Sequence, residues 1–190
     1  MITLKAATPT AWVSAVLADF DAFLIDHAAA EKKASGMAIS MLSHYPDKPE
    51  IVRAMIDLSI EEMTHFREVV KIMTQRGLQL APDTRDPYVN ALRKLMRKDS
   101  SDYLLDRLLI GGIIETRGCE RFGLVADALP DGELKTFYDI ITRSEDKHGN
   151  LFVDLAALYF DEKNISQRLE TLLEEEAAIV LKLPITAALH

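Results

Sequence analysis

Apolar residues recur at helical spacing through most of the chain, and proline or glycine interrupts them at a few points. Thr8-Pro9 has the form of a helix cap followed by proline in the first turn, Pro46 stops the first long stretch, and Gly77 follows the second. We therefore expect four long helices and a shorter fifth helix. They run from Pro9 to about His44, from Pro49 to Arg76, from a cap at Ser100 or Ser101 to about Leu129, from the turn at Gly132 to about Phe160, and from Asn164 to about Lys182.

Residues 77 to 100 break this periodic pattern. Pro82, Pro87 and clustered charges mark a connector, in which residues 88 to 98 fit one short helix. A helix of about thirty residues is about 45 Å long, and a connector of this length can run back along it. The sequence therefore predicts an all-α fold: a four-helix bundle with a long crossover between helices 2 and 3 and an extra C-terminal helix, in a single domain over residues 1–190.

The composition adds three limits. The formal net charge is −8, so any nucleic-acid site must be a local basic patch on an acidic protein. Cys119 is the single cysteine, which excludes an internal disulfide and any zinc or iron–sulfur site that needs several thiolates. No signal-peptide pattern opens the sequence and no apolar run is long enough to span a bilayer, so we expect a soluble cytoplasmic protein without a membrane partner.

Two Glu-x-x-His motifs stand out among the polar residues. Glu62 with His65, and Glu145 with His148, have the spacing that places two side chains on one face of a helix. The chain has five histidines. Two such motifs among so few histidines arise by accident in roughly a few per cent of chains.

An isolated glutamate precedes each motif at nearly the same distance. Glu31 lies 31 residues before Glu62, and Glu115 lies 30 residues before Glu145. The pattern predicts two similar helical hairpins, each with one Glu and one Glu-x-x-His on an otherwise apolar stripe.

Three polar residues near these ligands are not included among the predicted metal ligands. Glu120 is an alternative to Glu115, but it lies 25 residues before Glu145 and breaks the symmetry. His27, one turn before Glu31, has two interpretations: a residue that supports the ligands from beside them, or an ordinary polar neighbour, which is preferred. Glu61 faces away from the ligand stripe and is interpreted as solvated.

Four carboxylates on apolar stripes need cations, because an unpaired ionised carboxylate in a dry core costs roughly several kcal/mol. Helical bundles meet this need with two metal ions, bound by one Glu from each of two helices and a Glu-x-x-His from each of the other two. Four carboxylates balance two divalent ions, and carboxylate with imidazole suits iron or manganese. The predicted metal ligands, with no catalytic residue beyond them, are Glu31, Glu62, His65, Glu115, Glu145 and His148.

Four blocks of residues surround these ligands. They are Leu24-Ile25-Asp26-His27 leading to Glu31-Lys32-Lys33-Ala34, Glu61-Glu62 with His65, Ile114-Glu115-Thr116-Arg117-Gly118-Cys119-Glu120-Arg121-Phe122, and Ser144-Glu145 with His148. Together they resemble the bacterial tRNA hydroxylase family that acts on 2-methylthio-isopentenyladenosine, called MiaE, and the resemblance extends from about Pro9 to Tyr159. Ala29-Ala30 and Gly149 depart from the pattern.

This resemblance implies a ferritin-like bundle with a non-haem di-iron site that uses dioxygen to hydroxylate the isopentenyl group of the modified adenosine in tRNA. Glu62 and Glu145 would bridge the two iron ions, and the other four ligands would be terminal. Each turnover needs two further electrons. The sequence has no flavin or nicotinamide fingerprint, so an external electron donor, a ferredoxin or a reductase, is implied.

A tRNA substrate requires local positive charge on this acidic protein. The densest basic cluster lies in the connector, beside Tyr88, which we expect to stack on a base. The expected tRNA-binding residues are Arg85, Arg93, Lys94, Arg97 and Lys98. A further rim of positive charge is expected from Lys32, Lys33, Arg117 and Arg121. The alternative for the connector is the solvated face of an amphipathic helix, and the acidic run Glu174 to Glu176 is also interpreted as a solvated face.

Two other interpretations use the same helices. A ferritin-like iron oxidase or peroxidase without a tRNA substrate would share every ligand, and iron loading or cage assembly would distinguish it. A metal-free helical interaction protein would expose its glutamates, and substitution of Glu62 or His148 would leave its stability unchanged. The sequence leaves open the native metal, iron or manganese, and the oligomeric state.

Overall fold

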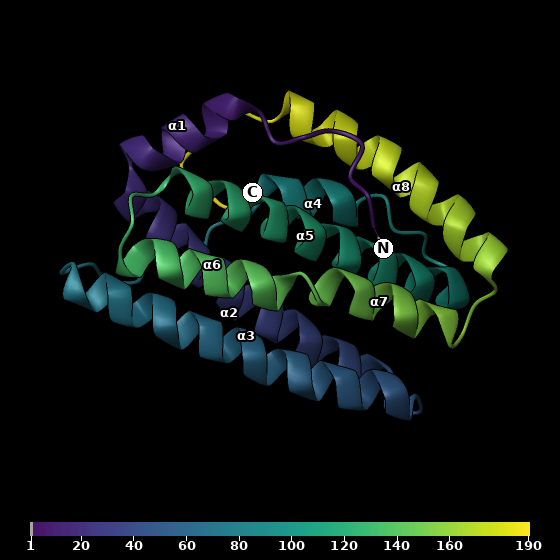
Figure 1. The fold of residues 1–190 in the computed structure, drawn as a ribbon. Helices are drawn as coiled ribbons and strands as arrows, with labels where there is room; N and C mark the ends of the chain where they lie inside the picture. Colours follow the sequence, from purple (N-terminus) through teal and green to yellow (C-terminus); the bar gives the residue numbers. More distant parts are fainter. Residues whose placement is uncertain (1) are drawn as a thin grey trace. The chain divides into compact units, whose positions relative to one another are not determined.

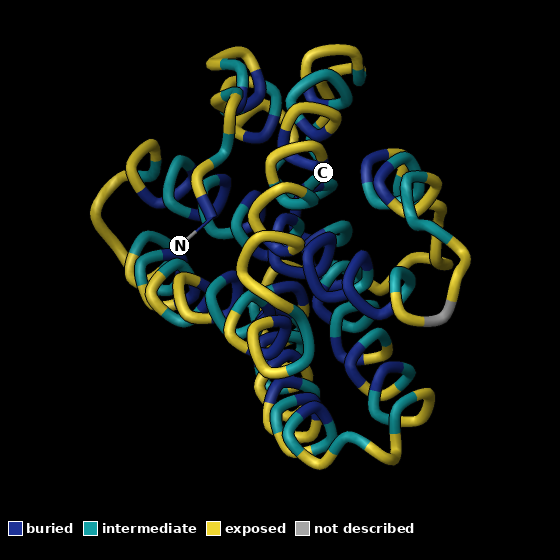
Figure 2. Tube along the Cα trace, turned by 90° about the vertical axis from the view of Figure 1, so that its right-hand side faces the viewer, coloured by how far each residue is buried: buried dark blue, intermediate teal, exposed yellow. Residues whose placement is uncertain are grey.

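The structure is a computed structural model of the chain, and it describes residues 2–190 except the side chain of Ser100. Within this range every regular element is a helix, so the predicted all-α class is confirmed (Figure 1). The helices are α1 (Thr10–Ala18), α2 (Phe20–His44), α3 (Pro49–Gln75), α4 (Pro87–Arg93), α5 (Ser100–Ala128), α6 (Glu133–Glu145), α7 (His148–Ala157) and α8 (Glu162–Lys182). Buried and exposed positions alternate around the helical turns, as amphipathic helices require (Figure 2).

The chain forms two compact units. One comprises Ser14–Thr84 with Thr186–Leu189, and the other comprises Met1–Val13, Arg85–Ile185 and His190. Each unit contains one of the two hairpins that the sequence predicts: α2 with α3 in the first, and α5 with α6 and α7 in the second. The single domain over residues 1–190 stays a prediction.

In the first unit, α2 and α3 lie side by side (Figure 1). The buried residues of α3 recur every three or four positions, which places one face of the helix against its neighbour. They are Ile51, Met55, Leu58, Glu62, His65, Val69 and Met73. Glu62 and His65 therefore occupy the buried face, as the apolar stripe predicts.

The first predicted helix is two helices in the structure. Asp19 separates α1 from α2, and its side chain caps α2 by accepting a hydrogen bond from the backbone N–H of Ala22. Leu17, an apolar residue near the end of α1, is exposed. A continuous helix to His44 is wrong here, because an aspartate that bonds to the backbone favours a helix start over a helix interior.

The fourth predicted helix is also two helices. α6 ends at Glu145 and α7 begins at His148, with a turn at Asp146 and Lys147 between them. Both turn residues keep right-handed helical backbone angles, and the N–H of Lys147 bonds to the carbonyl of Ser144, three residues back. Because the turn is tight, the side chains of Glu145 and His148 still lie close together, as they would in a continuous helix.

The connector between α3 and α5 contains the short helix α4, which covers Pro87–Arg93 rather than the predicted residues 88 to 98. Asp86 caps α4 by accepting a hydrogen bond from the backbone N–H of Val89. α5 begins at Ser100, and Asp99 is its cap residue. The cap predicted at Ser100 or Ser101 is therefore one or two residues late, and the side chain of Ser100 lies outside the described part.

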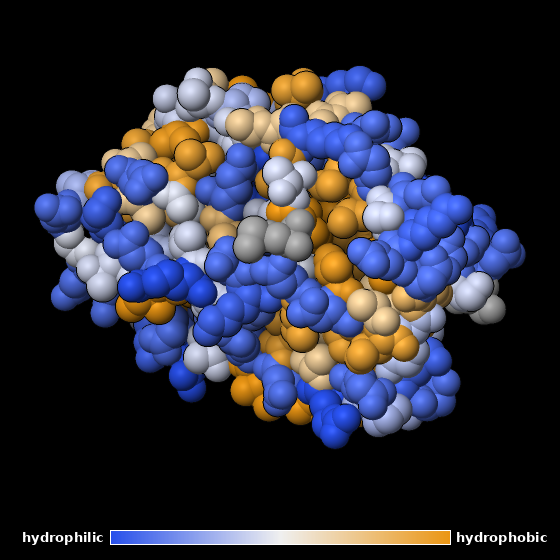
Figure 3. Space-filling model, turned by 45° about the vertical axis from the view of Figure 1, so that its right-hand side comes forward, coloured by the Kyte–Doolittle hydropathy of each residue, from blue (hydrophilic) through white to orange (hydrophobic). Residues whose placement is uncertain are grey.

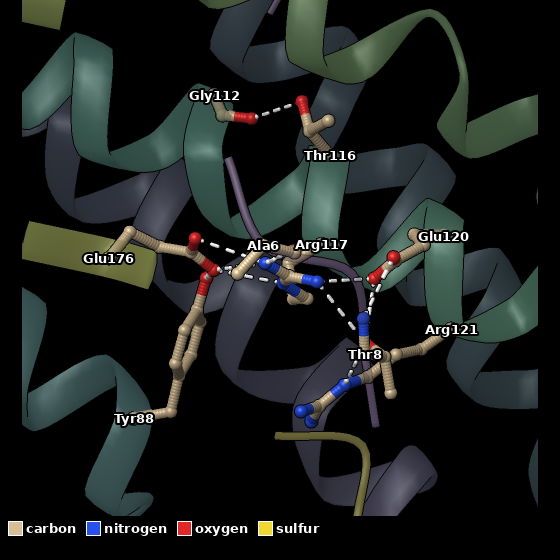
Figure 4. Close-up of polar contacts among 9 residues, drawn as sticks. All are labelled: Ala6, Thr8, Tyr88, Gly112, Thr116, Arg117, Glu120, Arg121 and Glu176. Atoms are coloured by element: carbon tan, nitrogen blue, oxygen red, sulfur yellow. Dashed lines mark hydrogen bonds and ion pairs between the residues drawn. The ribbon is translucent and has the colours of Figure 1, made fainter. Parts of the chain in front are cut away.

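The second unit contains a buried polar network (Figure 4). Arg117 of α5 is fully buried and donates to Glu176 of α8 at 2.8 and 3.0 Å. Tyr88 of α4 donates to the same carboxylate at 2.9 Å. Arg117 also donates to Thr8 at 3.2 Å and to Glu120. These bonds join α8, α4 and the segment before α1 to the middle of α5.

This network contradicts several expectations. Glu176, interpreted as solvated, and Tyr88, expected to stack on a base, are both fully buried. Arg117 and Arg121, expected on a positive rim, are buried as well, and Arg121 lies over the ring of Trp12 at 5.0 Å. Glu176 lies 59 residues from Arg117 along the chain, so local charge patterns give no sign of the pair.

The surface carries hydrophobic as well as hydrophilic residues. On the face drawn in Figure 3, the hydrophobic residues form patches between the hydrophilic ones. In the described range, none of the helices has both the length and the apolar character of a membrane span. Exposed apolar side chains include Ile56, Ile60 and Met63 on α3.

Replacement of Glu176 by alanine should lower the free energy of unfolding by about 3 kcal/mol, because buried Arg117 would lose one of its carboxylates. Urea unfolding followed by circular dichroism measures this change. Glu175→Ala, at the exposed neighbouring position, is the control and should cost less than about 0.5 kcal/mol. Similar losses in both variants would contradict the role given to the network.

Candidate metal centre

The first unit contains a buried triad of possible metal ligands: Glu31 on α2, and Glu62 and His65 on α3. One ligand atom from each lies within 4.8 Å of the others. Nδ1 of His65 is 3.6 Å from Oε2 of Glu31 and 3.9 Å from Oε2 of Glu62. These distances are longer than hydrogen bonds and suit ligands of one cation, since metal bonds of about 2 Å place neighbouring ligand atoms about 3 to 4 Å apart.

His27 supports this triad from one turn earlier on α2. Its ring is fully buried, and its Nε2–H donates to Oε1 of Glu31 at 2.6 Å, while Oε2 of Glu31 faces His65. Burial alone raises the pKa of Glu31, but the hydrogen bond from His27 and the nearby imidazole of His65 outweigh it and hold the pKa well below its usual range. Glu31 is therefore ionised, the form that binds a metal.

His27 is thus more than the ordinary polar neighbour expected from the sequence. Its i, i+4 spacing to Glu31 on a buried stripe is the signal that identifies the pair. A hydrogen bond of this kind orients a carboxylate that binds a metal and increases the metal affinity of the site. Glu61, by contrast, is exposed as expected.

The second unit contains a matching triad. Glu115 on α5, Glu145 at the end of α6 and His148 at the start of α7 each place one ligand atom within 4.8 Å of the others. Nδ1 of His148 is 2.8 Å from Oε2 of Glu145. In both triads, therefore, the Nδ1 atom of the imidazole faces carboxylate oxygens. Glu120, the alternative to Glu115, instead accepts hydrogen bonds from the backbone N–H and the hydroxyl of Thr8, at 3.0 and 2.6 Å.

The donor atoms of the two triads fit iron. Each triad offers two carboxylates and one imidazole, so two ionised carboxylates match one divalent ion. All six side chains are between 1% and 8% exposed, which makes close carboxylates repel each other strongly without a cation. Residues that fit an iron ion in this way are thus present, in the same combination, in both units.

Cys119 lies one turn after Glu115 on α5 and is not suited to join the ligands. Its thiol donates to the backbone carbonyl of Thr142 at 3.4 Å. Burial raises the pKa of the thiol to about 11, and nearby carboxylates add to this effect. The neutral thiol is a poor ligand for iron compared with the surrounding carboxylates.

The basic residues predicted to bind tRNA fall into two groups. Arg85, Arg93, Lys94 and Lys98 are exposed, whereas Arg97 is half-buried. The guanidinium of Arg97 donates to Asp106 of α5 at 2.7 Å, and Arg168 of α8 donates to the same carboxylate at 2.8 Å. Arg97 is therefore paired with a buried carboxylate, and this ion pair ties the connector to α5.

Lys32 and Lys33, expected on the positive rim, contact the start of the connector. Lys32 forms an ion pair with Asp83 at 2.8 Å, and Lys33 donates to the backbone carbonyl of Thr84 at 2.9 Å. Both side chains are half-buried, so they stabilise the path of the connector in addition to adding positive charge.

The whole fold matches a solved structure, "Protein 43 with aldehyde deformylating oxygenase activity from Synechococcus". The TM-score is 0.93 and the sequence identity 33%, over 100% of this chain and 96% of that chain. This match confirms the predicted class, an all-α fold of the ferritin-like type.

Sequence comparison then gives the family. The family described as tRNA-(MS[2]IO[6]A)-hydroxylase (MiaE) matches residues 1–190. A relative from Pseudomonas putida is 36% identical over 177 residues, 93% of this chain and 86% of the relative. One from Salmonella typhimurium is 33% identical over 132 residues, 70% of this chain and 48% of the relative. Both relatives are named tRNA 2-(methylsulfanyl)-N(6)-isopentenyladenosine(37) hydroxylase. The chain belongs to the MiaE family.

Replacement of Glu62 by glutamine should have opposite effects with and without metal. In chelated protein it should raise the midpoint of thermal unfolding by about 2 to 4 °C, the shift expected from about 1 kcal/mol, because one buried charge is removed. With ferrous iron under anaerobic conditions, the stabilisation by metal should be smaller than in the wild type. Calorimetry measures both effects.

Glu61→Gln is the matched control, since Glu61 is the exposed neighbour of Glu62 on α3. It should change neither midpoint. A wild-type protein that gains no stability from ferrous iron would contradict the assignment of the triads.

Proposed function

We propose that this protein is a non-haem di-iron monooxygenase that hydroxylates the isopentenyl group of 2-methylthio-isopentenyladenosine in tRNA. Membership of the MiaE family and the names of two relatives support the reaction and the substrate. The observation that carries the chemistry is the repeated buried triad of two glutamates and one histidine.

The two triads together are proposed to hold one dinuclear centre. Its ligands would be Glu31, Glu62, His65, Glu115, Glu145 and His148, and Glu62 and Glu145 would be the carboxylates shared by the two ions. Four carboxylates neutralise two ferrous ions, and the imidazoles add no charge. A ferritin-like bundle is the architecture in which one Glu from each of two helices and a Glu-x-x-His from each of two others meet in this way.

When bound, two ferrous ions reduce dioxygen and supply the oxidant for an allylic C–H bond. The residues of the chain prepare the site for this chemistry. His27 keeps Glu31 ionised and correctly oriented through its 2.6 Å hydrogen bond. Apolar residues beside the ligands, such as Leu58 and Phe152, are buried and exclude water from the reacting groups.

Two partners follow from this reaction. Each turnover consumes two electrons beyond those of the substrate, so an external donor, a ferredoxin or a reductase, is proposed. The tRNA is proposed to contact the exposed basic residues of the connector, which are Arg85, Arg93, Lys94 and Lys98. The proposed compartment is the cytoplasm, where tRNA is modified.

An iron oxidase or peroxidase with the same ligands is the alternative function. It would accumulate iron beyond two ions per chain and would act without tRNA. Metal analysis after aerobic loading separates the two, because a monooxygenase of this type should hold about two ions per chain.

Nucleoside mass spectrometry tests the reaction. Cells that lack the protein should contain the isopentenyl adenosine without its hydroxyl group, and return of the wild-type protein in air should add one oxygen atom. Growth under isotopically labelled dioxygen should place the label in that hydroxyl. Glu115→Ala should abolish the product through loss of a ligand, whereas Glu61→Ala should retain it. An unmodified nucleoside after return of the wild type would contradict the proposal.

Charge reversal at Arg93, Lys94 and Lys98 should weaken tRNA binding at least about tenfold and lower the salt dependence of the binding constant. Fluorescence anisotropy over a series of salt concentrations measures both. Arg97 is left unchanged, because its replacement would break the bond to Asp106.

The matched control reverses Arg53, Lys163 and Lys182, which are exposed on other helices and change the net charge equally. If both triple variants bind tRNA alike, the connector is not the binding surface.

A further inference from the structure

In the second unit, α5 and α7 approach each other closely at a point where both helices carry a glycine. A Cβ atom added at Gly149 of α7 would lie 2.4 Å from the hydroxyl oxygen of Thr116 and 3.4 Å from the backbone carbonyl of Gly112, both on α5. A Cβ atom added at Gly112 would lie 3.0 Å from the carbonyl of Gly149. The backbones of the two helices are therefore in contact at this point.

The side chain of Thr116 is not free to rotate away, because a hydrogen bond holds it. Its hydroxyl donates to the carbonyl of Gly112 at 2.7 Å, as Figure 4 shows. Rotation of the side chain away from a new Cβ at position 149 would break this hydrogen bond. The hydroxyl of Thr116 thus acts as a fixed spacer between α5 and α7.

This contact lies directly beside two predicted metal ligands. Thr116 follows Glu115 in the chain, and Gly149 follows His148. The turn at Asp146 and Lys147 separates α7 from α6, so the setting of His148 is not fixed by a continuous helix. The contact between α5 and α7 therefore fixes the position of His148 in place of a continuous helix.

We propose that Gly149, Thr116 and Gly112 are positioning residues that set the distance between His148 and Glu115, and so allow both to bind the same iron ion. This inference rests on the proposed function, because it takes Glu115 and His148 to be ligands. A side chain at position 149 would push the start of α7 away from α5. His148 would then move with it, because the two residues are adjacent.

The test compares four proteins: the wild type, Gly149→Ala, Thr116→Ala and the double variant. In Gly149→Ala, one of the two bound iron ions should be held roughly tenfold more weakly, the scale of loss when ligand orientation is disturbed. Thr116→Ala removes the hydroxyl but keeps the close approach of Gly112 and Gly149, so it should weaken iron binding less than Gly149→Ala does. The double variant should recover most of the binding, because the 2.4 Å contact is gone, and the next nearest atoms, the carbonyl oxygen of Gly112 and the Cβ of Thr116, lie at 3.4 and 3.6 Å.

Iron per chain is measured by titration under anaerobic conditions, and Mössbauer spectra show whether one iron site is altered selectively. Circular dichroism of the metal-free proteins checks that each variant is folded. Replacement of glycine by alanine inside a helix favours the helix by about 1 kcal/mol, so loss of helix propensity does not explain weaker binding. Gly123→Ala on α5 is the control, since its Cβ would meet only Thr142, at an ordinary 3.6 Å.

The outcomes separate this inference from the proposed function. A wild-type protein that binds no iron overturns both. A wild type with two iron ions, and a Gly149→Ala variant that binds them equally well, overturns the positioning role and leaves the proposed function standing. Weak binding in Gly149→Ala that the double variant does not restore overturns the steric explanation. Selective loss of one iron site, restored in the double variant, supports the inference.

Discussion

Burial of charged side chains is the constraint on which this structure depends. An ionised group inside a helical core is tolerated only when an opposite charge or a set of hydrogen bonds lies beside it. The protein meets this condition in two ways. Arg117 and Asp106 have partners from other helices of their unit, Glu176 and Arg168, which hold those helices together. The glutamates of the triads have imidazoles beside them and are proposed to have iron as their main partner.

Helix α5 contributes residues both to the buried ion pairs and to one of the triads. Around residue 115 it presents Glu115 to the triad, Arg117 to the buried network, and Thr116 to the backbone of α7. Three successive residues thus serve three different surroundings, because each residue of an α-helix is rotated by about 100° from the one before it. A change in the rotation or distance of this helix would disturb the metal ligands and the packing together.

The fold does not decide the reaction. The matching solved structure is described as an aldehyde deformylating oxygenase, whereas the relatives in sequence are named as tRNA hydroxylases. One helical architecture therefore supports different oxidations, and the substrate depends on the surface and the pocket presented to it. In this chain the exposed basic residues of the connector are the surface proposed to contact tRNA.

The sequence by itself determined most of the helices and placed the candidate ligands on buried stripes, because both depend on local periodicity. Apolar stripes and i, i+3 spacing are visible in any helix of sufficient length, and Glu62 and His65 lie on the buried face as the pattern predicts. The breaks at Asp19 and Asp146 were missed, because each interrupts a pattern that remains periodic on both sides.

Only the tertiary structure decided which charges are buried. Glu176 belongs to an acidic run that is typical of a solvated face, yet its partner Arg117 lies far away in the chain. Arg97 is half-buried, but its partner Asp106 is also bound by Arg168 of α8, a residue far from both in the chain. Solvation and ion pairing depend on neighbours in space, and neighbours that are distant in sequence leave no local signal.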